Sequence, residues 1–140
     1  INFFKEMINS KIIKIASNDK YVGLKNIFTH KCSLKNSLCG DFIKVEFVAS
    51  KTKIKSMRYE TKSCILCEAS ASLLSNKIKF SYIKDLKKDI NNLIKNFRDN
   101  NLIFPVKFKE FSYLLDKDNV SRTSCVTLPM EAFLKAFKDS

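Results

Sequence analysis

Residues 42–60 read FIKVEFVASKTKIKSMRYE, and this stretch predicts an antiparallel hairpin. Apolar and polar side chains alternate from residue 42 to 49, which is typical of a strand with one buried face. The alternation resumes over 53–60, and the short segment Ser50-Lys51-Thr52 between them suits a hairpin turn. In the first strand Ile43, Val45 and Phe47 share one face; in the second, Ile54, Ser56 and Arg58 alternate with Lys55, Met57 and Tyr59.

Cysteines flank the predicted hairpin. Cys39-Gly40-Asp41 comes just before it and Cys64 just after it. Because a hairpin returns the chain to where it began, Cys64 is expected close to Cys39. A thiolate and a carboxylate two residues apart form half of a metal site, and the segments 63–72 and 122–129 each bring a further cysteine. We therefore predict that three distant segments converge on one ion.

Two of these cysteines lie near predicted helix starts. Ser63 is the expected N-cap of one helix, which places Cys64 in its first turn. Thr127 is the expected N-cap of the last helix, and Cys125 lies just before this cap. Pro129 would then lie in the first turn of the helix, where proline is tolerated. The exposed amide groups of a helix N-terminus favour an anion, so both thiols are expected to act as thiolates.

Helical periodicity covers much of the remaining chain. Apolar residues recur at three- and four-residue intervals over 2–18 and over 80–100, and the helix after Ser63 extends to about residue 79. Residues 19–36 lack a clear period and are expected to form an ordered loop, while 106–115 predict a short helix or an irregular segment. The stripe within 80–100 consists of Ile83, Leu86, Ile90, Leu93, Ile94 and Phe97, with lysines opposite.

Composition predicts one domain over residues 1–140. The chain is 45% hydrophobic, which is ample for a core, and it contains no run of 18 apolar residues, so no membrane association is expected. The net charge is +12, but the 26 basic residues include only three arginines and are scattered. Without an arginine cluster, no specific nucleic-acid binding is predicted.

Cysteine usage indicates a reducing compartment. The chain has five cysteines, an odd number, and shows no secretion signal, so a disulfide framework is not expected. The prediction is a bacterial cytoplasm, or an organelle of bacterial descent if a targeting segment has been removed.

Three motifs in order give the chain a resemblance to a known family. They are Cys39-Gly40-Asp41, the run Ser-Cys-Ile-Leu-Cys-Glu-Ala-Ser-Ala-Ser from Ser63, and Arg122-x-x-Cys125-x-x-Leu128. Together they resemble the signatures of the IscU/SufU/NifU-type iron-sulfur cluster assembly scaffolds, over roughly residues 2–138.

The resemblance implies an α+β fold, a small antiparallel sheet of about three strands with helices on one face, as in SufE and IscU. It implies a site of Cys39, Asp41, Cys64 and Cys125 that holds a transient [2Fe–2S] cluster or Zn²⁺. It also implies partners: a cysteine desulfurase that supplies sulfur, with Cys64 and Cys125 as candidate acceptors, and iron-sulfur acceptor or carrier proteins. Arg122 matches the family's basic residue near the last cysteine.

Several alternatives stay open at this point. Ser124 precedes Cys125 where one branch of the family has histidine, which favours a SufU-like or divergent branch. A zinc-containing sulfur acceptor that activates the desulfurase is therefore the second hypothesis, and a basic structural or nucleic-acid-binding domain whose cysteines are only buried in the core is the third. Cys67 is interpreted as a flanking thiol rather than a ligand, and His30 and Cys32 as residues outside the site.

Overall fold

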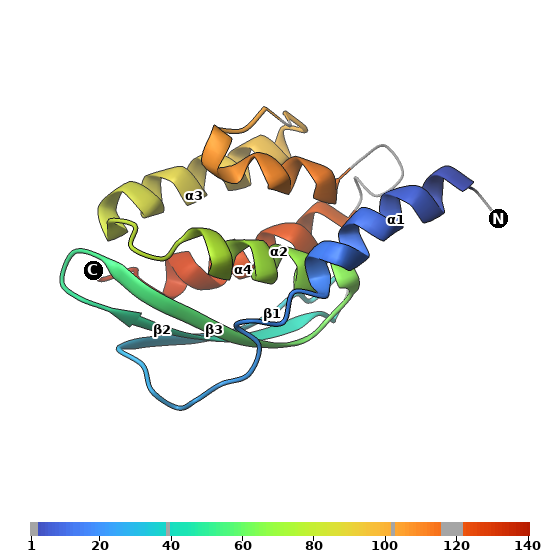
Figure 1. The fold of residues 1–140 in the computed structure, drawn as a ribbon. Helices are drawn as coiled ribbons and strands as arrows, with labels where there is room; N and C mark the ends of the chain where they lie inside the picture. Colours follow the sequence, from blue (N-terminus) through green and yellow to red (C-terminus); the bar gives the residue numbers. More distant parts are fainter. Residues whose placement is uncertain (1–2, 39, 102, 116–121) are drawn as a thin grey trace.

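The computed structural model describes residues 3–38, 40–101, 103–115 and 122–140, with the backbone alone for residues 3–9. A three-stranded antiparallel sheet, in the order β1-β2-β3, forms one layer, and the helices cover one of its faces (Figure 1). The α+β prediction is confirmed. Along the chain the elements are α1 (Phe3–Ala16), β1 (His30–Lys35), β2 (Phe42–Ala49), β3 (Ile54–Lys62), α2 (Ile65–Lys77), α3 (Ile83–Arg98), the 3₁₀ segment η1 (Val106–Leu114) and α4 (Thr123–Ala136).

The predicted hairpin is present, but a register shift changes which face of β3 its first residue occupies. Strands β2 and β3 pair from Phe42 with Lys62 to Ala49 with Ile54, and the register shifts between Val48 and Ala49. This bulge adds one residue to β3 and moves Ile54 to the face that Met57 and Tyr59 occupy, so all three are buried. The strict alternation predicted for residues 53–60 is therefore wrong at its start.

Strand β1 lies where the sequence predicted a loop. Its burial alternates, with His30, Cys32 and Leu34 half-buried and the residues between them exposed. It pairs with β2, His30 opposite Phe47 and Lys35 opposite Phe42. Pairing places residue 36 and the start of β2 at the same end of the sheet.

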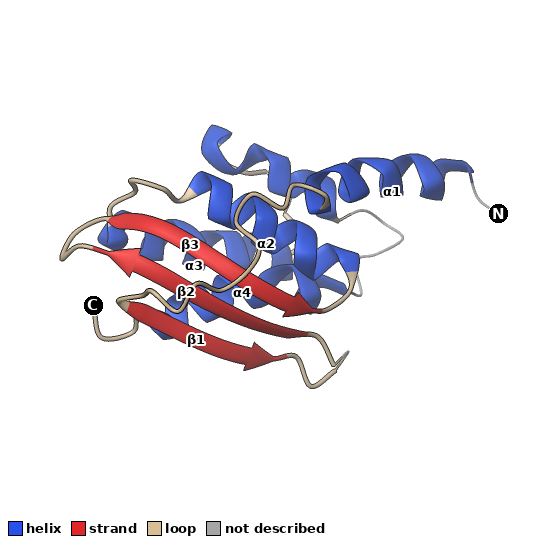
Figure 2. Ribbon diagram, turned by 60° about the horizontal axis from the view of Figure 1, so that its bottom comes forward, coloured by secondary structure: helices blue, strands red, loops and turns tan. Residues whose placement is uncertain are grey.

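The rest of the predicted loop, between α1 and β1, crosses the sheet on the side away from the helices (Figure 2). It first joins the free edge of β3, where the Gly23 amide donates to the Tyr59 carbonyl at 2.8 Å. Further along, the buried Glu46 carboxylate accepts hydrogen bonds from the Lys25 and Asn26 amides at 2.9 and 3.1 Å. This polar anchoring explains why residues 18–29 show no apolar period.

Helices α2 and α4 pack on the sheet and on each other, while α1, α3 and η1 pack against these two. Small residues in α2 are buried at this contact, and the Ser70 hydroxyl donates to the Val126 carbonyl of α4 at 2.6 Å. Both helices begin at the same end of the molecule, the right-hand end in Figure 1, where β3 ends. No helix in the described part of the chain is long and apolar enough to cross a lipid bilayer.

Candidate metal centre

Three ligand-type side chains meet at this end of the sheet. The ligand atoms of Asp41, Cys64 and Cys125 all lie within 4.8 Å of one another. Asp41 immediately precedes β2, Cys64 joins β3 to α2, and Cys125 lies in the first turn of α4. The hairpin and the packing of α2 on α4 thus gather residues that are more than 80 positions apart in the sequence.

Asp41 is buried, and both of its carboxylate oxygens face Cys64. Oδ1 accepts a hydrogen bond from the Cys64 amide at 3.0 Å, and Oδ2 accepts one from the Cys64 thiol at 3.2 Å. Cys64 is itself the N-cap of α2 and has no side-chain capping bond of its own. The Asp41 carboxylate therefore fulfils the capping role from another segment, by supplying an anionic acceptor to the N-terminus of α2.

The observed start of α2 corrects the predicted cap. Ser63 was expected to be the N-cap, but that position belongs to Cys64, and the Ser63 hydroxyl donates to the Cys64 carbonyl at 3.2 Å. Helix α2 also ends at Lys77, slightly before the predicted end. The thiol still lies at the helix N-terminus, one position earlier than predicted.

Helix α4 begins five residues earlier than the sequence indicated. Its N-cap is Arg122, and Thr127 and Pro129 lie buried inside the helix. Pro129 has no N–H to donate to the carbonyl four residues before it, that of Cys125. Because α4 begins at Thr123, Cys125 lies in its first turn, where amide groups lack intrahelical partners. Cys125 is 1% exposed.

Arg122 brings a positive charge to this centre. Negative charge on Cys64 and, less strongly, on Cys125 and Asp41 raises the pKa of the Arg122 guanidinium, and its hydrogen bond with Cys125 acts in the same direction. The side chain is exposed, so solvent screens the attraction. Arg122 therefore offsets part of the anionic charge that two thiolates and a carboxylate would accumulate.

Asn36, which the sequence reasoning did not single out, connects two parts of the centre. Its amide group donates to the Ser124 hydroxyl of α4 at 2.8 Å and accepts from the Leu38 amide at 3.0 Å. Its backbone amide donates to the Asp41 carbonyl at 2.7 Å. The available signal was an asparagine three residues before Cys39, since asparagine side chains readily bond to the backbone of their own turn.

The other predicted residues separate into two groups. Cys39 lies outside the described residues, so its role stays a prediction. Cys67 is fully buried, and Cys32 and His30 lie on β1; none of these three belongs to the described cluster. The His30 ring stacks on Phe137 with centroids 4.1 Å apart.

The Cys32 thiol is packed against the apolar core rather than directed at the cluster. Burial raises its pKa, an effect that the nearby Lys135 ammonium opposes. This thiol is therefore mostly protonated at neutral pH.

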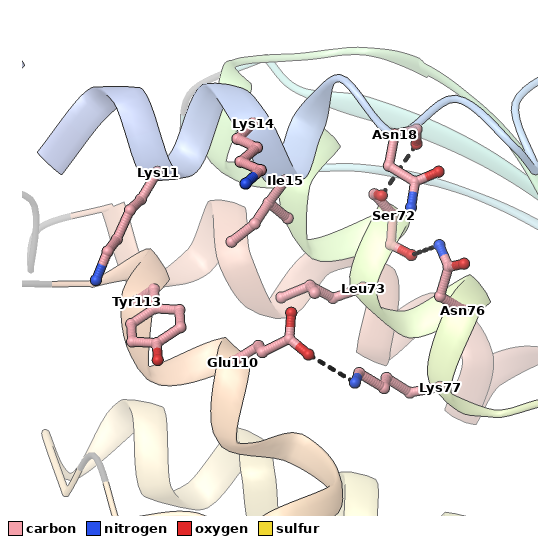
Figure 3. A pocket seen from close by; sticks show the side chains of 10 residues that line it. All are labelled: Lys11, Lys14, Ile15, Asn18, Ser72, Leu73, Asn76, Lys77, Glu110 and Tyr113. Carbon is pink, nitrogen blue, oxygen red and sulfur yellow. Dashed lines mark hydrogen bonds and ion pairs between the residues drawn. The ribbon is translucent and has the colours of Figure 1, made fainter. Parts of the chain in front are cut away.

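A cavity of about 500 Å³ lies apart from this cluster, between α1, α2 and η1 (Figure 3). Lys77 and Glu110 form an ion pair of 2.6 Å across it, and Tyr113 and Lys11 lie together at its far end. No member of the Asp41, Cys64 and Cys125 cluster lines this cavity. It does not contribute ligands to the candidate metal centre.

The donor set of the cluster fits a thiophilic metal. Two thiols and one carboxylate are ligands that zinc and iron-sulfur centres accept. Two atoms bound to one zinc ion at about 2.0–2.3 Å lie at most about 4.6 Å apart, so small side-chain rotations would bring the three donors onto one ion. On binding a metal, the Cys64 thiol would lose the hydrogen that it donates to Asp41.

Comparisons with known proteins point to one family. Residues 7–109 match the family described as NifU-like N terminal domain. The chain is 26% identical over 136 residues to the iron-sulfur cluster assembly scaffold protein IscU of Thermotoga maritima, covering 96% of this chain and 95% of that protein.

Solved structures share the fold at lower sequence identity. The N-terminal part of a NifU-like protein from Brucella abortus superposes with a TM-score of 0.81 at 18% identity, covering 98% of this chain and 96% of that one. A putative iron-sulfur cluster assembly scaffold protein for the SUF system from Fervidobacterium islandicum gives a TM-score of 0.73 at 19% identity, covering 94% and 97%. With the family match spanning most of the chain, this protein belongs to the NifU-like N-terminal domain family.

Proposed function

We propose that this protein is an iron-sulfur cluster assembly scaffold of the IscU/SufU/NifU type. The observation that carries the proposal is the approach of Asp41, Cys64 and Cys125 to within 4.8 Å of one another at one end of the sheet. The family match and the similarity to the Thermotoga scaffold support it. Cys39, adjacent in sequence to the Gly40-Asp41 turn, is proposed as the fourth ligand.

The proposed cargo is a [2Fe–2S] cluster. The thiolates of Cys39, Cys64 and Cys125 would hold iron strongly, whereas the Asp41 carboxylate is a harder and weaker iron ligand. In addition, the Asp41 oxygens have an alternative partner in the Cys64 amide, 3.0 Å away. Asp41 is therefore the proposed release ligand, since it stabilises α2 when it is not bound to iron.

Sulfur is proposed to come from a cysteine desulfurase, and the product to pass to iron-sulfur acceptor or carrier proteins. Cys64 is a candidate sulfur acceptor because it lies at the N-terminus of α2 and is partly exposed, whereas Cys125 is almost completely buried. A thiolate must reach the donor sulfur for transfer to occur. The geometry therefore favours Cys64 over Cys125 for this step.

A zinc-containing sulfur acceptor that activates the desulfurase is the second candidate function. It is favoured by a donor set that suits tetrahedral zinc and by Ser124 before Cys125. In that case one thiolate would leave zinc to receive the persulfide sulfur.

Anaerobic reconstitution distinguishes the two functions. The protein is incubated with Fe²⁺, cysteine, a desulfurase and dithiothreitol as the reductant, then analysed for iron, zinc, acid-labile sulfide and visible absorbance. Equal iron and sulfide, followed by transfer to an apo-ferredoxin, supports the scaffold. One tightly bound zinc with faster desulfurase turnover, and no cluster, would contradict the scaffold and favour the sulfur acceptor.

A further inference from the structure

Asn36 uses all of its polar groups to close one turn and to attach that turn to α4. Its backbone amide donates to the Asp41 carbonyl and its carbonyl accepts from the Gly40 amide, each at 2.7 Å. Its side-chain oxygen accepts from the Leu38 amide at 3.0 Å. Asn36 is thus bonded to Leu38, Gly40 and Asp41.

Gly40 allows this closure because its φ is +76°, a left-handed conformation that residues with a side chain rarely adopt. The amide it presents to Asn36 would point elsewhere in an extended backbone. The chain then reverses so that Asp41 immediately precedes β2, with its carboxylate directed at Cys64.

The remaining donor of Asn36 leaves the turn. Its side-chain nitrogen donates to the Ser124 hydroxyl at 2.8 Å, and Ser124 directly precedes Cys125 in the first turn of α4. The Asn36 side chain is 8% exposed, so water competes weakly for this bond. A side-chain amide carries both an acceptor and a donor, so Asn36 bonds to the turn and to the helix at once.

We infer that Asn36 is a positioning residue that fixes the Asp41 turn relative to Cys125 before any metal binds. The inference rests on the proposed function, in which Asp41, Cys64 and Cys125 bind one metal centre. Asp41 is already tied to Cys64 by two hydrogen bonds, and Asn36 supplies the corresponding tie to the helix of Cys125. Without it, the turn and α4 would have to be brought together at the moment of binding, at a cost in affinity.

Zinc affinity and the Co²⁺ spectrum of the full chain test this role. In Asn36→Ala, competition with a chromophoric chelator should show zinc binding weakened about 10- to 100-fold, the range typical of outer-sphere partners of metal ligands. The thiolate-to-cobalt charge-transfer bands of Asn36→Ala should shift or weaken. A general loss of stability would not change these bands in the molecules that remain folded. Asn76→Ala is the matched control, because the Asn76 amide also donates a 2.8 Å bond, to the Ser72 carbonyl, away from the centre.

A double-mutant cycle isolates the bond to α4. Ser124→Ala should weaken zinc binding in the same direction, and Asn36→Ala combined with Ser124→Ala should lose little more than Asn36→Ala alone. Losses that multiply in the double variant, or wild-type affinity and an unchanged cobalt spectrum in Asn36→Ala, would overturn the inference. If Asn36→Ala fails to fold by circular dichroism, Ser124→Ala alone decides the matter, because wild-type affinity in that variant contradicts the role.

The wild-type arm separates this inference from the proposed function. A wild-type protein that takes up neither zinc, cobalt nor a cluster contradicts the proposed function. If the wild-type protein binds metal and the Asn36 and Ser124 variants bind it equally tightly, only the positioning role is contradicted.

Discussion

Replacing Asp41 should destabilise the metal-free protein, because its carboxylate caps α2. In Asp41→Ala the Cys64 amide loses its acceptor at 3.0 Å and the thiol loses its acceptor at 3.2 Å. A hydrogen bond to a charged group contributes about 1.5–3 kcal/mol, and loss of a helix cap costs about 0.5–2 kcal/mol. Part of this is offset because the variant no longer buries a carboxylate, Asp41 being 5% exposed.

We therefore expect the free energy of unfolding to fall by about 1–2 kcal/mol in Asp41→Ala. For a chain of 140 residues that corresponds to a decrease in Tm of about 3–7 °C. Asp41→Asn keeps an oxygen that can accept from the Cys64 amide, so it should lose less than Asp41→Ala. Urea and thermal unfolding with chelator and reductant measure both variants, and wild-type stability in Asp41→Ala would refute the capping role.

The same substitution should act oppositely on a bound cluster. If Asp41 is the release ligand, a reconstituted [2Fe–2S] cluster should persist longer in Asp41→Ala than in wild type, measured as decay of visible absorbance under matched anaerobic conditions. An equal or shorter lifetime would eliminate that role for Asp41. A variant less stable without metal yet longer-lived with its cluster cannot be explained by general destabilisation.

Three further predictions concern Cys67, the two glycines and Cys32. Cys67→Ala should retain wild-type zinc affinity while losing about 1 kcal/mol of stability for its buried sulfur; an affinity loss comparable to that of Cys64→Ala would make Cys67 a ligand. Gly40→Ala should cost about 1–2 kcal/mol through its positive φ alone, since, beyond the adjacent residues, no atom of the described part of the chain lies within 4 Å of an added Cβ. Gly23→Ala, with φ +98°, should cost a similar amount but, unlike Gly40→Ala, leave zinc affinity unchanged. Burial raises the pKa of Cys32, so iodoacetamide at pH 8 should alkylate the Cys32 thiol more slowly than it alkylates the thiol of free glutathione. Equal alkylation rates of the two thiols, measured by mass spectrometry, would contradict the burial of Cys32.

Elements with a strong apolar period were predictable. All six residues of the stripe in α3 are buried as expected, and the hairpin lies where the alternation of β2 and β3 placed it. Strand β1 was missed because its inward face carries His30, Cys32 and Leu34, which give little apolar signal. Pairing with β2, a long-range effect, makes it a strand.

The site was predictable in outline and less so in detail. Asp41, Cys64 and Cys125 meet because the hairpin and the α2 and α4 packing bring their segments to one end. The start of α4 was placed too late because Pro129 was interpreted as a first-turn residue, although the helix tolerates it in its interior. The tie between Asn36 and Ser124 joins residues 88 positions apart, and no local pattern indicates such a contact.

The most direct measurement of the central claim is the number of sulfur atoms bound to the metal. X-ray absorption at the zinc edge of the zinc-loaded protein should show about three sulfurs at about 2.3 Å and one oxygen at about 2.0–2.2 Å, and Cys125→Ser should reduce the sulfur count by one. A zinc shell made only of nitrogen and oxygen, or one unaffected by Cys125→Ser, would contradict the account.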